Sequence, residues 1–309
     1  MIRSFMSEYR IIIYLLAFTL IGVICFPRFA TARNLFNVIN QSPVAIIGAV
    51  ALNFMLIAGN IDLSAGYLVG LVSICIGKLA GAGVPVWIII LLAVLMGALA
   101  GLINGTLVTY LSVPAFIATL GSGYIFYGIA QMIAGSYAIR GIPEALKTFG
   151  KYFVFGKIQL MFFYAVAIVI VGHVIMDRTK YGRVLSNIGI NRQAARMSGL
   201  NVDLCHMLSF VFCSTLVAFT AILSTIRVNT AQADMGGGTY TFDAVMASVL
   251  GGTAFNGGKA NIIGGMFAVL LIKEIEVLMT ILGINKYFYT AFLGVIVLVV
   301  IIMQCRSKR

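Results

Sequence analysis

Charged residues are scarce in this sequence. Only 10% of its 309 residues are Asp, Glu, Lys or Arg, whereas 61% are hydrophobic. A soluble domain carries roughly 25% charged residues, which cover its water-facing surface. The composition therefore excludes a water-soluble globular protein and predicts one that lies within a lipid bilayer.

The motifs of common catalytic and metal sites are also absent. The five cysteines form no Cys-x-x-Cys pair, and His173 and His206 lie on different segments, so no disulfide framework or metal site is predicted. The zinc-protease motif HExxH and the nucleophile motif GxSxG do not occur. We therefore expect a protein that is not an enzyme and holds no cofactor, with His173 and His206 as packed or interfacial residues.

A phosphate-binding loop is missing as well. The nearest string is TAFNGGKA, in which Thr253 stands where the first glycine of the loop belongs and Ala260 where Ser or Thr belongs. Any transport driven by ATP would therefore depend on a separate ATPase subunit.

Acidic residues are fewer than basic ones, and the net charge is +12. In a soluble protein this excess would suggest nucleic acid as a partner. Here the basic residues lie mostly between apolar runs, where Lys and Arg orient a protein in the membrane. We expect no nucleic-acid partner.

Long apolar runs predict an all-α polytopic membrane protein with about ten transmembrane helices, because a helix needs about 20 apolar residues to cross a bilayer. The whole chain, residues 1–309, is then one transmembrane domain. The predicted spans are 11–26, 43–59, 66–83, 86–110, 113–135, 158–176, 204–228, 240–256, 262–282 and 286–304. Segments 43–66 and 240–261 end in glycine-rich polar sequence, and whether they cross fully or are broken helices stays open.

Basic residues near the span ends predict the orientation. Ten spans place both termini and the loop 177–203 on one side, and Lys and Arg cluster in all three regions, which marks that side as the cytoplasm. The terminal residues that support this orientation are Arg3, Arg10, Arg306, Lys308 and Arg309.

The polar loop 177–203 has the signals of a short helix. Asn191 is a good N-cap, Gly199 is a good stop, and Asn201 can cap the span that follows. The enclosed helix is about 10 Å long at 1.5 Å per residue. Ala194, Met197 and Ser198 share one of its faces, and Arg192 and Arg196 share another.

Two interpretations of this helix stay open. It is either a basic anchor at the membrane surface, or a helix that docks in a groove of a cytoplasmic partner, which requires an apolar face of this kind.

Ionisable residues inside membrane spans are costly and suggest function. Asp62 lies in NIDLSAG, and we favour a role in capping the helix that starts near Ser64 over direct contact with a solute. Asp243 lies near a helix start, where the helix dipole favours an acid. Lys273 and Glu276 are three residues apart and can form an ion pair or line a polar path.

Small residues predict close helix packing in one span. Gly97, Gly101 and Gly105 recur every four residues, which lets helices approach closely. Beside this seam, Asn104, Thr119 and Ser122 would suit a hydroxylated solute if they faced the path.

Several blocks resemble the ribose-type permeases of bacterial ABC importers. The string GRVLSNIGINRQAARMSGLNV, from residue 182, is similar to the cytoplasmic loop that carries the coupling helix in that family. AGNIDLSAGYLVGL (58–71), the block at 101–130 and the block at 233–265 are similar to further family motifs, in the family's order.

The resemblance implies a permease of the bacterial inner membrane that moves a monosaccharide or similar small polar solute by alternating access. It also implies a cytoplasmic ABC ATPase, a second permease copy or paralogue, and an extracytoplasmic solute-binding protein as partners. The residues assigned to ATPase coupling are Asn191, Arg192, Ala194, Ala195, Arg196, Ser198 and Gly199. The candidates for the translocation path or gate are Asn60, Asp62, Ser64, Asn104, Thr119, Asp243, Asn256, Lys273 and Glu276.

Two alternatives remain at this stage. The solute could instead be a furanose signal molecule, a nucleoside or a branched-chain amino acid. A different class of protein, an ion-coupled secondary transporter, would use Glu274, Glu276 and Asp62 as a relay.

Overall fold

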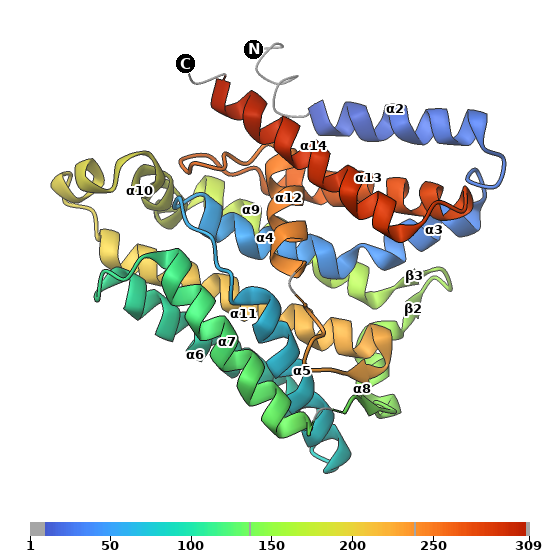
Figure 1. Ribbon diagram of the computed structural model, residues 1–309, viewed down its shortest axis with the longest axis horizontal. Helices are drawn as coiled ribbons and strands as arrows, with labels where there is room; N and C mark the ends of the chain where they lie inside the picture. Colours follow the sequence, from blue (N-terminus) through green and yellow to red (C-terminus); the bar gives the residue numbers. More distant parts are fainter. Residues whose placement is uncertain (1–9, 136, 238, 307–309) are drawn as a thin grey trace.

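The computed structural model describes residues 10–135, 137–237 and 239–306, and nearly all of its regular structure is helical (Figure 1). The helices of the first half are α2 (Arg10–Cys25), α3 (Ala32–Gln41), α4 (Pro43–Leu56), α5 (Ala65–Gly81), α6 (Val86–Thr109), α7 (Ala115–Ala134) and α8 (Glu144–Lys151). Those of the second half are α9 (Leu160–Arg178), α10 (Lys180–Met197), α11 (Val202–Val228), α12 (Tyr240–Leu250), α13 (Ile262–Ile281) and α14 (Lys286–Arg306).

Strands are confined to two small antiparallel pairs within the described ranges. β1 (Ile139–Arg140) pairs with β4 (Thr230–Ala231), and β2 (Phe153–Val154) pairs with β3 (Ile158–Gln159) in a hairpin. Each strand has two residues, so the predicted all-α class is confirmed.

Length and composition confirm a polytopic membrane protein. Within the described ranges, five helical segments are long and apolar enough to cross a bilayer. They are Ala32–Leu56, Val86–Thr109, Ala115–Ala134, Leu160–Arg178 and Val202–Val228. The number of ten crossings and the side of the termini stay predictions, and Arg3, Lys308 and Arg309 lie outside the described residues.

Two elements are broken helices. α12 has 11 residues, about 16 Å of helix at 1.5 Å per residue, against a hydrocarbon core of about 30 Å. Gly252, Gly257 and Gly258, which follow it, all have positive φ and end the helical path. The predicted helical span 240–256 is therefore wrong beyond Leu250.

Another interruption lies earlier in the chain, because residues 57–64 are non-helical between α4 and α5. We call residues 57–64 the first break and residues 251–261 the second break.

Short helices outside the apolar runs were not predicted. In α3 the Thr31 hydroxyl accepts a hydrogen bond from the Asn34 amide. α8 follows Pro143, and it has Glu144 in its first turn and Lys151 in its last, as the helix dipole favours. Both helices depend on polar caps and charges, which a search for apolar runs does not detect.

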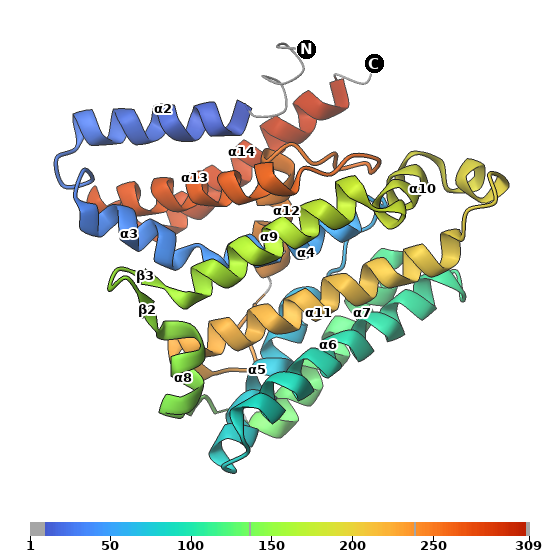
Figure 2. The same cartoon turned by 180° about the vertical axis from the view of Figure 1, so that it is seen from behind.

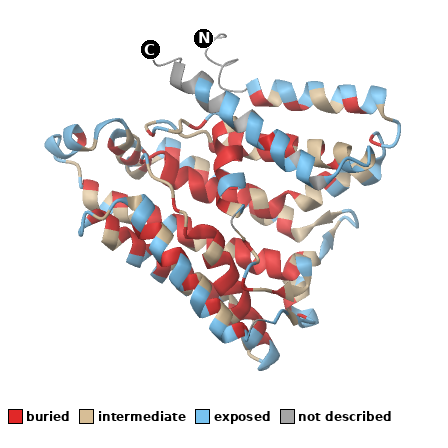
Figure 3. Cartoon of the chain, viewed as in Figure 1, coloured by how far each residue is buried: buried red, intermediate tan, exposed pale blue. Residues whose placement is uncertain are grey.

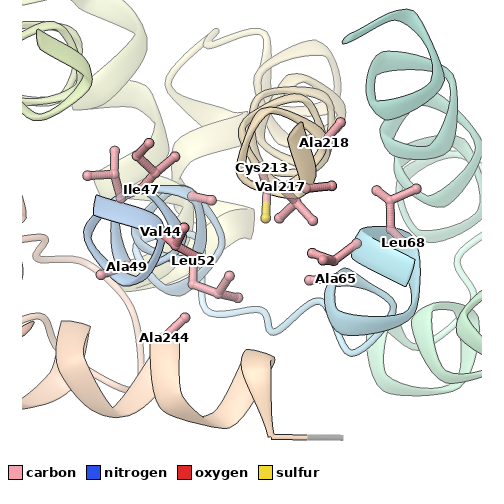
Figure 4. Packing of buried hydrophobic residues seen from close by; sticks show 14 of the residues in the cluster. Val44, Ile47, Ala49, Leu52, Ala65, Leu68, Cys213, Val217, Ala218 and Ala244 are labelled. Carbon is pink, nitrogen blue, oxygen red and sulfur yellow. The ribbon is translucent and has the colours of Figure 1, made fainter. Parts of the chain in front are cut away.

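The core is built around α4. All its residues except Ala45 are buried, as expected of a helix that is apolar on every side. α9, α11, α12 and α13 pack around it, and α9 lies beside it in the view from behind (Figures 1 and 2). The buried residues form a band through the middle of the molecule (Figure 3). At its centre, Cys213 and Val217 of α11 lie between α4 and α5 (Figure 4).

The predicted glycine seam is confirmed where α6 packs on α11. A Cβ atom at Gly101 would lie 2.5 Å from the Phe210 carbonyl oxygen, and one at Gly97 would lie 2.6 Å from that of Ser214. These glycines therefore set the distance between the two helices.

Gly101→Ala should lower the stability of the purified protein, because the added methyl group would force α6 and α11 apart. Overpacking of this kind costs about 1–3 kcal/mol. The matched control is Gly128→Ala on α7, where a Cβ would meet nothing within 4 Å. Thermal unfolding in detergent should show a lower midpoint for Gly101→Ala alone. Equal midpoints for the two variants would contradict the seam.

Candidate functional site

The polar loop contains a capped helical turn, as predicted. α10 is interrupted at Asn191, whose φ of −159° and ψ of 102° are extended, and the Asn191 Oδ1 atom accepts a hydrogen bond from the Ala194 amide at 3.0 Å. Gly199 has φ +74° and its amide donates to the Arg196 carbonyl at 3.1 Å. Asn201 then caps α11 through its Oδ1 atom, which accepts from the Leu204 amide at 3.2 Å. We call residues 191–199 the capped segment and residues 180–190 the anchor helix.

The capped segment turns different residues outward and inward. Ala194, Met197 and Ser198 are exposed, Met197 at 83%, whereas Ala195 is only 4% exposed. Ala195 therefore packs within the chain rather than on the outward surface of the segment. The outward surface of the segment lies at one end of the molecule (Figure 1).

The two arginines of the segment share one acceptor. The Nη2 atoms of Arg192 and Arg196 donate to the Asp203 Oδ1 atom at 3.1 Å and 2.5 Å. Asp203 lies in the first turn of α11. These ion pairs tie the capped segment to the start of α11.

The anchor helix meets both breaks through backbone contacts. The Ser186 hydroxyl donates to the Gly258 carbonyl, and the Gly258 amide donates to the Ile57 carbonyl at 2.9 Å. Gly189 fits so closely that a Cβ there would lie 1.9 Å from the Ile57 carbonyl oxygen and 2.5 Å from the Gly258 nitrogen. We call this meeting of Ile57, Gly189 and Gly258 the glycine junction.

The first break is held by a buried polar network. The Asp62 Oδ1 atom accepts hydrogen bonds from the Ser64 amide at 2.9 Å and hydroxyl at 2.5 Å, so Asp62 orders the start of α5 as predicted. Asn104 of α6 donates to the Ser64 hydroxyl at 2.9 Å, and Ser214 of α11 donates to the Asp62 Oδ2 atom at 3.4 Å. All four side chains are fully buried, and their mutual hydrogen bonds offset part of the cost of removing them from water, although the Asn104 Oδ1 atom has no partner among the described residues.

A second polar cluster surrounds His206, which is 2% exposed. The Asn60 Nδ2 atom lies 2.8 Å from His206 Nε2, and the Thr109 hydroxyl lies 2.8 Å from His206 Nδ1. The expected packing role of His206 is confirmed.

The second break is tied to α4 by residues that sequence reasoning missed. Asn53 lies in the last turn of α4 and donates to the Ser248 hydroxyl at 3.2 Å, while its Oδ1 atom accepts from the Thr253 hydroxyl. Thr253 in turn accepts from the Asn261 amide at 2.9 Å. The available signal was an asparagine inside an otherwise apolar span.

The other path candidates lie apart from these clusters. Thr119 is buried on α7, and its hydroxyl donates to its own helix at the Ala115 carbonyl. Asp243, in the first turn of α12, and Asn256, in the second break, are exposed. The predicted pair on α13 is confirmed, with Lys273 Nζ 2.6 Å from Glu276 Oε2.

Glu274 has a different partner from its neighbours on α13. The Thr19 hydroxyl of α2 lies 2.9 Å from each carboxylate oxygen of Glu274 and 2.8 Å from the Leu15 carbonyl, so its one hydrogen is shared among these acceptors. Of the nine path candidates, the hydrogen bonds thus join Asp62, Ser64 and Asn104, and place Asn60 in the neighbouring histidine cluster.

Comparison with known proteins shows the family to which the chain belongs. Residues 34–301 match the family described as the branched-chain amino acid transport system permease component. The chain belongs to this family of permeases. The permease is 33% identical over 306 residues to the galactose/methyl galactoside import permease protein MglC of Escherichia coli (strain K12), covering 93% of this chain and 91% of the relative.

Two further relatives also match over most of their length. The ribose import permease protein RbsC of the same strain is 28% identical over 310 residues, covering 99% of the permease and 96% of the relative. The autoinducer 2 import system permease protein LsrC of Yersinia enterocolitica is 27% identical over 297 residues, covering 94% and 80%. No solved structure matches the permease.

Gly189→Ala should disrupt the permease where the anchor helix meets the breaks, because its Cβ would overlap the Ile57 carbonyl oxygen. The backbone on both sides of Gly189 would have to move. The expected result is a loss of transport in cells and a lower unfolding midpoint. Overpacking of this kind lowers the free energy of unfolding by about 1–3 kcal/mol.

Gly121→Ala on α7, where nothing lies within 4 Å, is the matched control and should behave like the wild type. A Gly189→Ala permease with normal stability and transport would show that the junction tolerates displacement.

Proposed function

We propose that the permease is the membrane subunit of an ATP-driven bacterial importer of a monosaccharide or a similar small polar solute. Its place would be the bacterial inner membrane, and ATP hydrolysis would occur in a separate subunit. The match to sugar import permeases over more than nine tenths of both chains carries the proposal.

The arrangement of α10 supports this mechanism. The capped segment exposes Ala194 and Met197 at one end of the molecule, as a helix that docks on another subunit requires. Its other half, the anchor helix, contacts both breaks. A push on the capped segment by an ATPase would therefore reach the two places where the helices are interrupted.

The path and gate would lie near the first break. Asn60, Asp62, Ser64 and Asn104 gather there, between α4, α6 and α11. A small movement of this region would change which side of the membrane the polar groups face, as alternating access requires.

Three partners belong to the proposal: a cytoplasmic ABC ATPase, a second permease that is identical or a paralogue, and an extracytoplasmic solute-binding protein. The names of the relatives, which are import permeases or an import system component, support such an assembly. The solute is proposed as a monosaccharide because the relatives named for galactose and ribose match over most of their length. A furanose signal molecule is the second candidate, favoured by the autoinducer 2 relative.

Uptake should require the ATPase. In cells that express the importer, an ATPase with an inactive nucleotide site should abolish accumulation of the sugar that the cognate binding protein binds. An uncoupler that collapses the proton gradient should leave the initial uptake rate intact when ATP is maintained. Uptake that survives without the ATPase but stops with the proton gradient would favour the ion-coupled transporter.

Met197→Glu should weaken assembly with the ATPase, because it places a carboxylate on the outward apolar surface of the capped segment. We expect about a tenfold or greater loss of ATPase co-purification, since hot spots at interfaces cost about 2 kcal/mol or more. Asn187→Glu adds the same charge at an exposed position of the anchor helix, before the kink, and is the control.

Membrane insertion of both variants should equal that of the wild type. Unchanged assembly in Met197→Glu, or an equal loss in both variants, would remove the capped segment as the docking element.

A further inference from the structure

A cavity of about 470 Å³ lies directly behind the capped segment. It opens between the first break, the α6–α7 link, the capped segment and the start of α11. Its lining includes Thr109, Ser112, Pro114, Ala115, Arg192 and Arg196. Among the described residues, no acidic side chain lines the cavity, whereas two arginines do.

The guanidinium groups of Arg192 and Arg196 each use only one nitrogen in their ion pairs with Asp203. Arg192 and Arg196 each donate one Nη2 group to the same oxygen of Asp203, so two positive charges face one negative charge. The Nε atom of Arg192 is buried and has no hydrogen-bond partner among the described residues. The guanidinium group of Arg192 therefore has donor capacity that Asp203 does not use.

The histidine cluster supplies a further donor. The Asn60 amide group donates to the Ala58 carbonyl as well as to His206 Nε2, which fixes Nε2 as an acceptor. The ring proton then lies on Nδ1 and is donated to the Thr109 oxygen. This leaves the hydroxyl hydrogen of Thr109 available to an acceptor in the cavity that Thr109 lines.

A helix start also points to a negative occupant. Pro114 and Ala115, at the first turn of the 20-residue helix α7, line the cavity. Pro114 has no N–H group, and its carbonyl accepts from the Ile117 and Ala118 amides, so this helix start offers an anion the Ala115 amide and the helix dipole. Ser112, which also lines it, has φ +55°, a strained backbone conformation for a residue other than glycine.

We propose that this cavity binds a phosphate group, either free phosphate or the phosphate of a small ester such as a sugar phosphate. The planar guanidinium groups suit the oxygens of phosphate, and the helix start and the Thr109 hydroxyl add donors from the opposite wall. The volume exceeds that of a single phosphate ion and leaves room for a small organic group.

The two arginines line the cavity while their side chains remain partly exposed, at 39% for Arg192 and 60% for Arg196. Arg192 and Arg196 line the cavity, whereas Ala194 and Met197 lie on the outward surface of the same turn. One turn of helix would thus carry a subunit contact on one side and an anion on the other. A bound phosphate would join the capped segment to α7 and so restrain it. That this happens on the cytoplasmic side, where phosphate esters are abundant, rests on the proposed function.

The test measures binding to the purified full-length permease in nanodiscs by calorimetry at physiological salt. The probes are inorganic phosphate, glucose 6-phosphate and uncharged glucose. We expect saturable binding of phosphate or of glucose 6-phosphate, and none of glucose. Similar affinities for the two phosphates assign the free ion, and tighter binding of glucose 6-phosphate assigns an ester; both outcomes support the site.

Variants locate the binding site. Arg196→Gln should weaken binding about tenfold or more, since it removes a charge-assisted hydrogen bond. Thr109→Val keeps the side-chain volume and should weaken it less. Arg183→Gln, on the exposed side of the anchor helix, removes the same charge outside the cavity and should bind like the wild type.

Absence of saturable binding to the folded wild type, or an equal loss in Arg183→Gln, overturns the proposal. If no phosphate binds and Arg196→Gln fails to assemble with the ATPase, the cavity belongs to the subunit interface. Because binding is measured on the permease alone, a negative result leaves the proposed transport function standing. Failure of ATP-dependent uptake would equally leave the binding result intact.

Discussion

A broken helix inside a bilayer leaves backbone groups without partners, and lipid offers none. The permease resolves this constraint by bringing its two breaks together. The Gly258 amide of the second break donates to the Ile57 carbonyl of the first, and Gly189 of the anchor helix closes over both. Several helices are interrupted at this junction: α4 ends just before Ile57, and Gly258 lies in the break between α12 and α13.

The junction also explains why glycine and small polar side chains gather in these segments. Two backbone segments can approach this closely only where no Cβ lies between them. The atoms around Gly189 belong to the backbone, so no side chain could move aside to make room for a larger residue. The polar groups beside it, Asp62 with Ser64 and Asn53 with Thr253, hold each break in one conformation. A rigid connection of this kind suits a protein that must transmit movement rather than dissipate it.

Much of this was predictable from sequence wherever a local rule decides the structure. Apolar runs predicted the helical class, the caps at Asn191 and Asn201 predicted the capped segment, and four-residue glycine spacing predicted the seam between α6 and α11. The anchor helix was missed because its sequence mixes polar, apolar and glycine residues without a long apolar run, and it is held by tertiary contacts. The outward or inward direction of Ala194 and Ala195 also depends on the kink at Asn191, which periodicity does not reveal. The meeting of residues 57, 189 and 258 joins positions far apart in the chain, which no local pattern could predict.

We propose that the anchor helix and the second break move as one body when an ATPase drives the capped segment. Spin labels at the exposed positions Asn187 and Asn256, in an otherwise cysteine-free permease, test this movement in the assembled importer. Their separation, measured by electron–electron double resonance without nucleotide and with ATP bound, should stay the same while uptake is active. A separation that changes with ATP in a transport-competent importer would show instead that the anchor helix slides over the breaks.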